Sequence, residues 1–69
     1  MKLSARNVFK GTVTAIEIGA VNVEIVVAIA PGIEITSIIT KKSCENLELA
    51  VGKETYVIVK ASNMMIGTE

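Results

Sequence analysis

The sequence has no histidine, no aspartate and no tryptophan, and it contains a single cysteine, Cys44. Without histidine, the chain cannot form a Ser-His-Asp or Cys-His catalytic arrangement. One cysteine cannot form an internal disulfide, and it cannot supply the ligand spacing of a tetrahedral zinc site. The nucleotide-binding patterns G-x-x-x-x-G-K-[S/T] and G-x-G-x-x-G are also absent. We therefore expect no enzymatic activity and no metal cation held directly by side chains.

Aromatic residues and charge of one sign are scarce as well. Phe9 and Tyr56 are the only aromatic residues, and seven basic residues balance seven acidic ones. Because nucleic-acid binding relies on a basic surface and often on stacking rings, an OB-type nucleic-acid-binding module is an alternative that the composition disfavours. The longest nearly continuous apolar run, Ile25 to Pro31, is much shorter than the roughly 20 residues of a membrane span. The first residues lack the apolar segment of a secretory signal, so we expect a cytoplasmic protein without membrane or nucleic-acid partners.

What the sequence has in excess is aliphatic residues. Its 69 residues predict one small domain over 1–69, and 51% of them are hydrophobic. A domain of this size buries only about 60% of the surface of its unfolded chain. Neither a disulfide nor a metal is available to stabilise it, and oligomerisation is the remaining common solution. We therefore expect a homo-oligomer with an apolar interface.

The alternation of apolar and polar residues predicts β-strands. A long first strand begins at Gly11, and two consecutive apolar residues, Ala15 and Ile16, predict a bulge or bend within it. After a short turn at Gly19-Ala20, alternation on both sides of Pro31-Gly32 predicts a hairpin over residues 21 to 40.

The second half of the chain predicts one helix and two further strands. Thr40 is a suitable N-cap for a short helix from Lys41 to Leu49. The strands are expected at Thr55–Ala61 and, after a kink, at Asn63–Ile66. The resulting order predicts an all-β fold, namely a small five-stranded OB-like barrel with a short helix between strands three and four.

Two polar patches flank these strands. The first is Ser4-Ala5-Arg6-Asn7 and the second is Lys60-Ala61-Ser62-Asn63. Since the first and last strands of a small barrel are commonly neighbours, we expect the patches to meet, within one subunit or across two. Hydroxyl groups, amides and cationic side chains without acceptors are the groups that bind a small oxyanion. The alternative is that Arg6 and Lys60 are ordinary solvated charges.

Four segments of the chain resemble the molbindin family of small molybdenum-pterin-binding (Mop) proteins, which have TOBE-like domains. They are Ser4-Ala5-Arg6-Asn7 with Lys10-Gly11, Ile18-Gly19-Ala20-Val21, Thr36-Ser37-Ile38-Ile39 and Val59-Lys60-Ala61-Ser62. The resemblance covers essentially the whole chain. It implies an OB-like barrel in a homohexamer built from three dimers. It also implies that molybdate or tungstate binds at subunit interfaces, for intracellular molybdenum storage or homeostasis.

The resemblance also implies two classes of molybdate site. The first class uses the two polar patches, here Ser4, Ala5, Arg6, Asn7, Lys60, Ala61 and Ser62. Relatives often carry serine at the position of Ala61, so a hydroxyl contact would be lost there, whereas a backbone N–H contact would be unchanged. The second class lies near the three-fold axis and uses main-chain amides of the Gly-Ala-Val turn. In this chain the corresponding residues are Gly19, Ala20, Val21 and Asn22, with Ser37 or Thr36 as further candidates.

The chemistry of the patches suits molybdate, which is a dianion whose four oxygens only accept hydrogen bonds. Phosphate carries a proton near neutral pH, and neither patch offers a carboxylate to receive it. An unsatisfied donor of this kind costs about 1–3 kcal/mol. Sulfate can be rejected only by size, and tungstate is too similar in size to be rejected well. A molybdopterin cofactor is the alternative ligand, but the sequence offers no obvious slot for a pterin ring beyond Tyr56.

Overall fold

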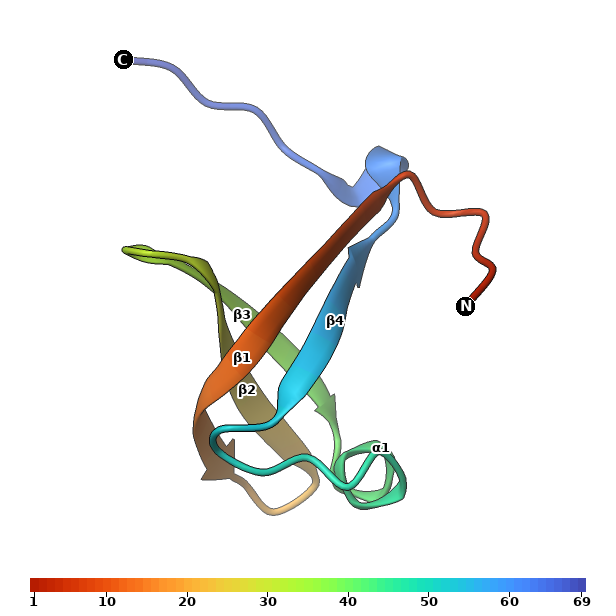
Figure 1. Cartoon of the computed structure of the whole chain (residues 1–69), viewed down its shortest axis with the longest axis vertical. Helices are drawn as coiled ribbons and strands as arrows, with labels where there is room; N and C mark the ends of the chain where they lie inside the picture. Colours follow the sequence, from red (N-terminus) through yellow and green to blue (C-terminus); the bar gives the residue numbers. More distant parts are fainter.

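A computed structural model describes all residues from 1 to 69. It contains the elements β1 (Asn7–Ile18), β2 (Asn22–Ala30), β3 (Ile33–Thr40), α1 (Lys41–Asn46), β4 (Glu54–Val59) and the 3₁₀ turn η1 (Ala61–Asn63). The strands form one antiparallel sheet in the order β3-β2-β1-β4. The sheet is strongly curled, with α1 at its lower end (Figure 1). The prediction of an all-β fold with a short helix before the last strand of the sheet is confirmed.

β1 is the strand that both halves of the sheet share. Its first half, Asn7–Thr12, pairs with β4, and its second half, Thr12–Ile18, pairs with β2. The strand therefore begins at Asn7 and not at Gly11, because pairing with β4 extends it through four more residues. A register shift between Val13 and Ala15 marks a bulge, slightly earlier than predicted. Such a bulge bends the strand and lets it serve both halves of the sheet.

The β2–β3 hairpin and the start of α1 agree with the predictions. The hairpin turns at Pro31-Gly32, where Gly32 has a φ of +74°, a conformation that glycine adopts without strain. The Thr40 hydroxyl accepts a hydrogen bond from the Ser43 N–H at 3.1 Å and so caps α1. The helix stops at Asn46, short of the predicted Leu49, because the chain turns into a left-handed conformation at Glu48.

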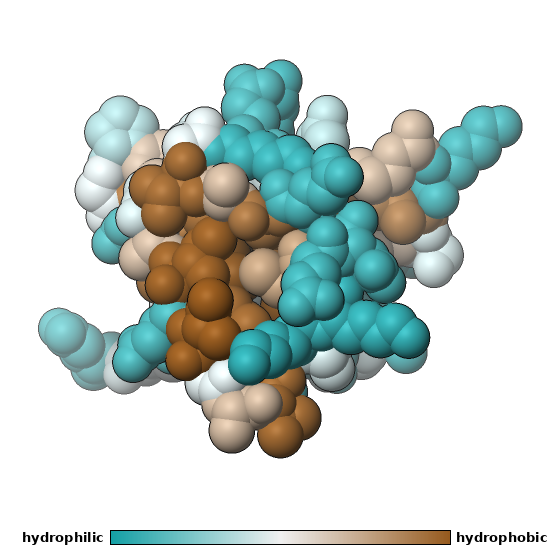
Figure 2. Space-filling view, turned by 90° about the horizontal axis from the view of Figure 1, so that it is seen from below, coloured by the Kyte–Doolittle hydropathy of each residue, from teal (hydrophilic) through white to brown (hydrophobic).

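The core of the molecule is small. Only four residues are fully buried, namely Val13, Val23, Ile25 and Val27. Around them pack partly buried apolar side chains from all four strands, from α1 and from the loop after it. Many large apolar side chains remain exposed. Figure 2 shows an apolar patch over part of the face seen from below, next to hydrophilic residues. One chain therefore has more apolar surface than its own core can bury.

The predicted fifth strand is absent from the single chain. Asn63 ends η1, and the residues after it run away from the curled sheet, which is not closed into the predicted barrel (Figure 1). Met65 and Ile66 are 93% and 91% exposed. A strand needs a neighbouring strand for its backbone hydrogen bonds, and the chain does not place this segment beside one. The sheet has four strands, and its two outermost strands, β3 and β4, are not joined to each other. Neither helix is long and apolar enough to cross a membrane.

Candidate functional site

The antiparallel pairing of β1 and β4 brings the two polar patches together within one chain. Asn7 lies opposite Val59 at the end of this ladder. The residues before β1 and the residues after β4 therefore leave the sheet at the same end. They line an open pocket of about 640 Å³, whose walls are Ser4, Ala5, Arg6, Ile58, Lys60, Ala61, Ser62 and Asn63. We call this the Arg6–Lys60 pocket.

The second patch is shaped by η1. The Asn63 N–H donates to the Lys60 carbonyl at 2.9 Å, and the Met64 N–H donates to the Ala61 carbonyl at 3.2 Å. These bonds curl the chain directly after β4 and turn Lys60 and Ser62 toward the segment before β1. N–H groups at the start of a helical turn have no partner within it. Ala61 therefore offers a ligand its backbone N–H, although its side chain has no donor.

The Arg6–Lys60 pocket contains two cationic side chains and no carboxylate. Both cations are exposed, and neither is part of an ion pair, since the one ion pair in the structure joins Lys10 Nζ to Glu54 Oε2 at 3.3 Å. The positive charge of the pocket is therefore available to a ligand. Hydrogen bonds from cationic donors to an anion are stronger than bonds between neutral groups.

One lining residue, Ile58, belongs to neither predicted patch, and one predicted ligand, Asn7, lies outside the pocket. Ile58 and Asn63 line the pocket, whereas Asn7 is half-buried in β1 and does not. Side chains two positions apart on a strand lie on the same face, so Ile58 could have been found from its spacing to Lys60. Asn63 belongs to the second predicted patch, in which its polar side chain had been included.

The predicted second site lies at the other end of β1. The turn after Ile18 is closed by a hydrogen bond from the Gly19 N–H to the Asn22 carbonyl at 2.8 Å. Gly19 and Asn22 line an open pocket of about 360 Å³ together with Glu17, Ile18, Glu24 and Ile38. Ala20 and Val21 are exposed in the same turn. We call this the Gly19 pocket.

Ser37 is not brought to the Gly19 pocket. It lies on β3 opposite Ile25 and lines a mostly apolar cavity of about 120 Å³ between β3 and β4. Its neighbour Thr36 lies opposite Val26. Within one chain, neither residue can add a hydroxyl to the turn at Gly19, because both lie several residues along β3 from Thr40, which is the residue paired with Asn22 beside that turn.

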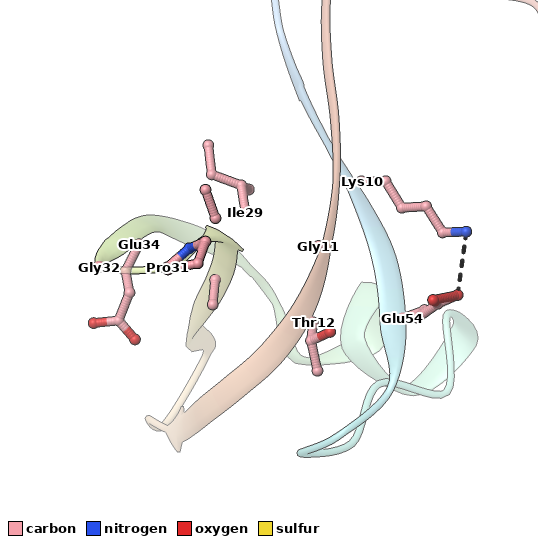
Figure 3. A pocket seen from close by; sticks show the side chains of 10 residues that line it. Lys10, Gly11, Thr12, Ile29, Pro31, Gly32, Glu34 and Glu54 are labelled. Atoms are coloured by element: carbon pink, nitrogen blue, oxygen red, sulfur yellow. Dashed lines mark ion pairs between the residues drawn. The ribbon is translucent and has the colours of Figure 1, made fainter.

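A further open pocket of about 610 Å³ separates β1 from the tip of the β2–β3 hairpin (Figure 3). Its one cation, Lys10, is paired with Glu54 and points away from the hairpin tip. Glu34 adds a second carboxylate to the lining. The pocket therefore has no free positive charge with which to bind an anion. No group of three or more cysteine and glutamate side chains could hold a metal ion either.

Most of the chain matches a known domain family. Residues 3–66 match the model of the TOBE domain. The chain belongs to the TOBE domain family. It is 44% identical over 69 residues to a probable molybdenum-pterin-binding protein of Haemophilus influenzae, and the match covers all of both chains. The resemblance to the Mop proteins is thus confirmed, and with it the expectation that the chain is not an enzyme.

Longer proteins contain a similar unit. The chain is 49% identical over 69 residues to the molybdenum transport protein ModE of Azotobacter vinelandii, of which it spans only 26%. In structure it is similar to ModG, a cytoplasmic molybdate-binding protein solved with molybdate bound. The TM-score is 0.95 and the identity 45%, over all of this chain and 49% of ModG. The fold of this chain is therefore one that holds molybdate in at least one solved relative.

Proposed function

We propose that this chain is a single Mop domain that binds molybdate in the cytoplasm, in the Arg6–Lys60 pocket, and serves molybdenum storage or homeostasis. The observation that carries the proposal is the combination of two unpaired cations with hydroxyl and amide donors and no carboxylate. The matched relatives that are named for molybdenum-pterin binding or molybdate binding support it.

The pocket's donors account for the class of anion. A tetrahedral dianion that only accepts hydrogen bonds can be satisfied by Ser4, Ser62 and backbone N–H groups, with Arg6 and Lys60 balancing its charge. Hydrogenphosphate would present a proton for which the lining has no carboxylate. Tungstate has the same charge and nearly the same size, so we expect it to bind about as well. The lining has no aromatic ring, and a pterin ring therefore lacks a stacking partner.

We further propose that the binding unit is a homo-oligomer, built as a hexamer of three dimers. The unpaired outer edges of β3 and β4 flank an apolar cavity whose lining includes Ile39, Leu49 and Val57. The segment Met64–Ile66 is apolar and exposed. In the assembly this segment would become the fifth strand by pairing with a second copy. It would then form hydrogen bonds with a free strand edge of that copy and cover its apolar cavity.

Oligomerisation and ligand binding are then connected through the chain. The exposed segment begins directly after Asn63, which lines the Arg6–Lys60 pocket. A partner that orders Met64–Ile66 would also cover this pocket, and charge-assisted hydrogen bonds gain strength as water is excluded. The molybdate would then lie at a subunit interface, as the resemblance implies.

The test is equilibrium dialysis of the purified protein with molybdate, tungstate, sulfate and phosphate, together with its mass in solution by light scattering. We expect a hexamer that retains molybdate and tungstate in preference to phosphate. The variant Met65→Glu/Ile66→Glu should dissociate the oligomer and lose molybdate, whereas Thr68→Glu, which places a charge beyond the apolar segment, should do neither. A monomeric wild-type protein, or one that binds phosphate as well as molybdate, would contradict the proposal.

A further inference from the structure

Ile58 is the one large apolar side chain in the lining of the Arg6–Lys60 pocket. It lies on β4 two positions before Lys60, where the chain is still extended, so the two side chains share a face of the sheet. The other lining residues are either alanines or carry hydrogen-bond donors in their side chains. The pocket therefore has a single apolar wall among polar groups.

Val8 is the residue with which Ile58 can be compared. The two lie directly opposite each other in the β1–β4 ladder, so their side chains are on the same face. Val8 is 39% exposed and Ile58 is 45% exposed, but only Ile58 lines the pocket. A partner that covers this face would bury both residues. An effect on ligand binding that belongs to Ile58 and not to Val8 is therefore an effect of the pocket wall.

The polar side chains of the lining are free to bind a ligand. None of them takes part in a side-chain hydrogen bond or an ion pair within the chain, namely Ser4, Arg6, Lys60, Ser62 and Asn63. An anion among these groups exchanges its water for N–H and O–H donors. Against Ile58 it loses water and gains no hydrogen bond, and removing a charged group from water in this way is unfavourable.

The size of this cost depends on the anion. In the Born description, the cost of taking a given charge out of water grows as the radius of the ion falls. Sulfate and molybdate are both dianions without a proton at neutral pH, and sulfate is the smaller, so sulfate loses more hydration against an apolar wall. The donor side chains are exposed around an open pocket and can follow a smaller anion inward. Their reach alone is therefore a poor basis for rejecting sulfate.

We propose that Ile58 is a specificity-determining residue of the Arg6–Lys60 pocket, and that its apolar side chain favours molybdate and tungstate over the more strongly hydrated sulfate. This inference rests on the proposed function. Arg6 and Lys60 cannot make the distinction by charge, since all these anions are dianions. A hydroxyl in place of the apolar wall would return a hydrogen bond to the bound anion, and sulfate would gain more from it than molybdate.

The test measures the affinities of the full chain for molybdate, selenate and sulfate by calorimetric titration at neutral pH and equal ionic strength. Selenate is a dianion of intermediate size, so the wild type should bind the three in that order. In Ile58→Thr the ratio of molybdate affinity to sulfate affinity should fall by about threefold or more. The matched control Val8→Thr adds the same hydroxyl outside the pocket and should keep the wild-type ratio. Ile58→Val, which retains an apolar side chain, should keep it too.

The ratio is the decisive quantity, because a variant that only loosens the fold or the assembly weakens the binding of both anions together. An unchanged ratio in Ile58→Thr, or an equal change in Val8→Thr, would overturn this inference alone. A wild-type protein that binds sulfate or selenate as tightly as molybdate would overturn it as well, and that result does not depend on the folding of any variant. Absence of molybdate binding to the wild type would overturn the proposed function instead.

Discussion

β1 runs between two pockets, one at each end of the strand, that contain residues predicted to bind an oxyanion. At its first end, the ladder to β4 gathers Arg6 and Lys60 with hydroxyl and amide groups and keeps carboxylates out. At its second end, the ladder to β2 places Glu17 against Glu24 beside the turn. The difference arises from register, because the residues that face each other across a ladder are seldom close in sequence. Donor-rich segments therefore identify an anion site only together with the charges that pairing brings beside them.

The largest effect on molybdate affinity is expected from removing the two cations of the Arg6–Lys60 pocket. Arg6→Ala/Lys60→Ala deletes both unpaired positive charges of the Arg6–Lys60 pocket, and hydrogen bonds to charged groups contribute about 1.5–3 kcal/mol each. We expect molybdate affinity to fall by at least about a hundredfold in calorimetric titration. The control is Lys10→Ala, which removes a lysine that already pairs with Glu54 and should leave affinity unchanged. Equal losses in both variants would mean that only net charge matters.

Gly11 lies in the middle of β1, where the strand passes close to the backbone of β2. A Cβ added there would lie 2.5 Å from the Ala28 carbonyl oxygen and 2.7 Å from Val27 Cγ1. Because the first of these neighbours is backbone, the strands themselves must separate. We expect Gly11→Ala to lower the free energy of unfolding by about 1–3 kcal/mol, measured by chemical denaturation. Gly67→Ala, where nothing lies within 4 Å, is the matched control and should be neutral.

Within the first pocket, a cation and a hydroxyl can be compared directly. Lys60→Ala should weaken molybdate binding by about 1.5–3 kcal/mol, and Ser62→Ala by about 0.5–1.5 kcal/mol, since a neutral hydrogen bond contributes less than a charged one. Titration of both variants in the same buffer measures the difference. Losses of equal size would exclude Lys60 as a direct ligand.

The features that depend on residues close together in the sequence were predicted correctly. The alternation over residues 21 to 40, the Pro31-Gly32 turn and the Thr40 cap each depend on neighbours a few positions away, and all three are present. The two polar patches also meet, but the strand that pairs with β1 is β4 and not the last strand that was expected at residues 63 to 66.

The predictions that were wrong concern features that depend on contacts with residues elsewhere in the chain or in another copy. The helix ends early because Glu48 adopts a left-handed conformation and Lys53 Nζ bonds the Leu47 and Glu48 carbonyls at 2.8 and 3.1 Å. The strand expected at residues 63 to 66 has the right composition but no neighbouring strand in the single chain. The opposition of Glu17 and Glu24 required the register, which the bulge between Val13 and Ala15 sets.

The smallest effect is expected from a substitution that destabilises the structure near the Gly19 turn and leaves the Arg6–Lys60 pocket unchanged. Thr40 caps α1 and lies opposite Asn22, and the next residue donates its N–H to Val21, so the cap supports the Gly19 turn. Thr40→Ala should lower the free energy of unfolding by about 1 kcal/mol in chemical denaturation. Because the Arg6–Lys60 pocket lies at the opposite end of β1, molybdate binding to that pocket should keep its affinity. Thr36→Ala, on the same strand but without a capping bond, is the matched control. A parallel loss of molybdate binding in Thr40→Ala would mean that the two ends of β1 are coupled.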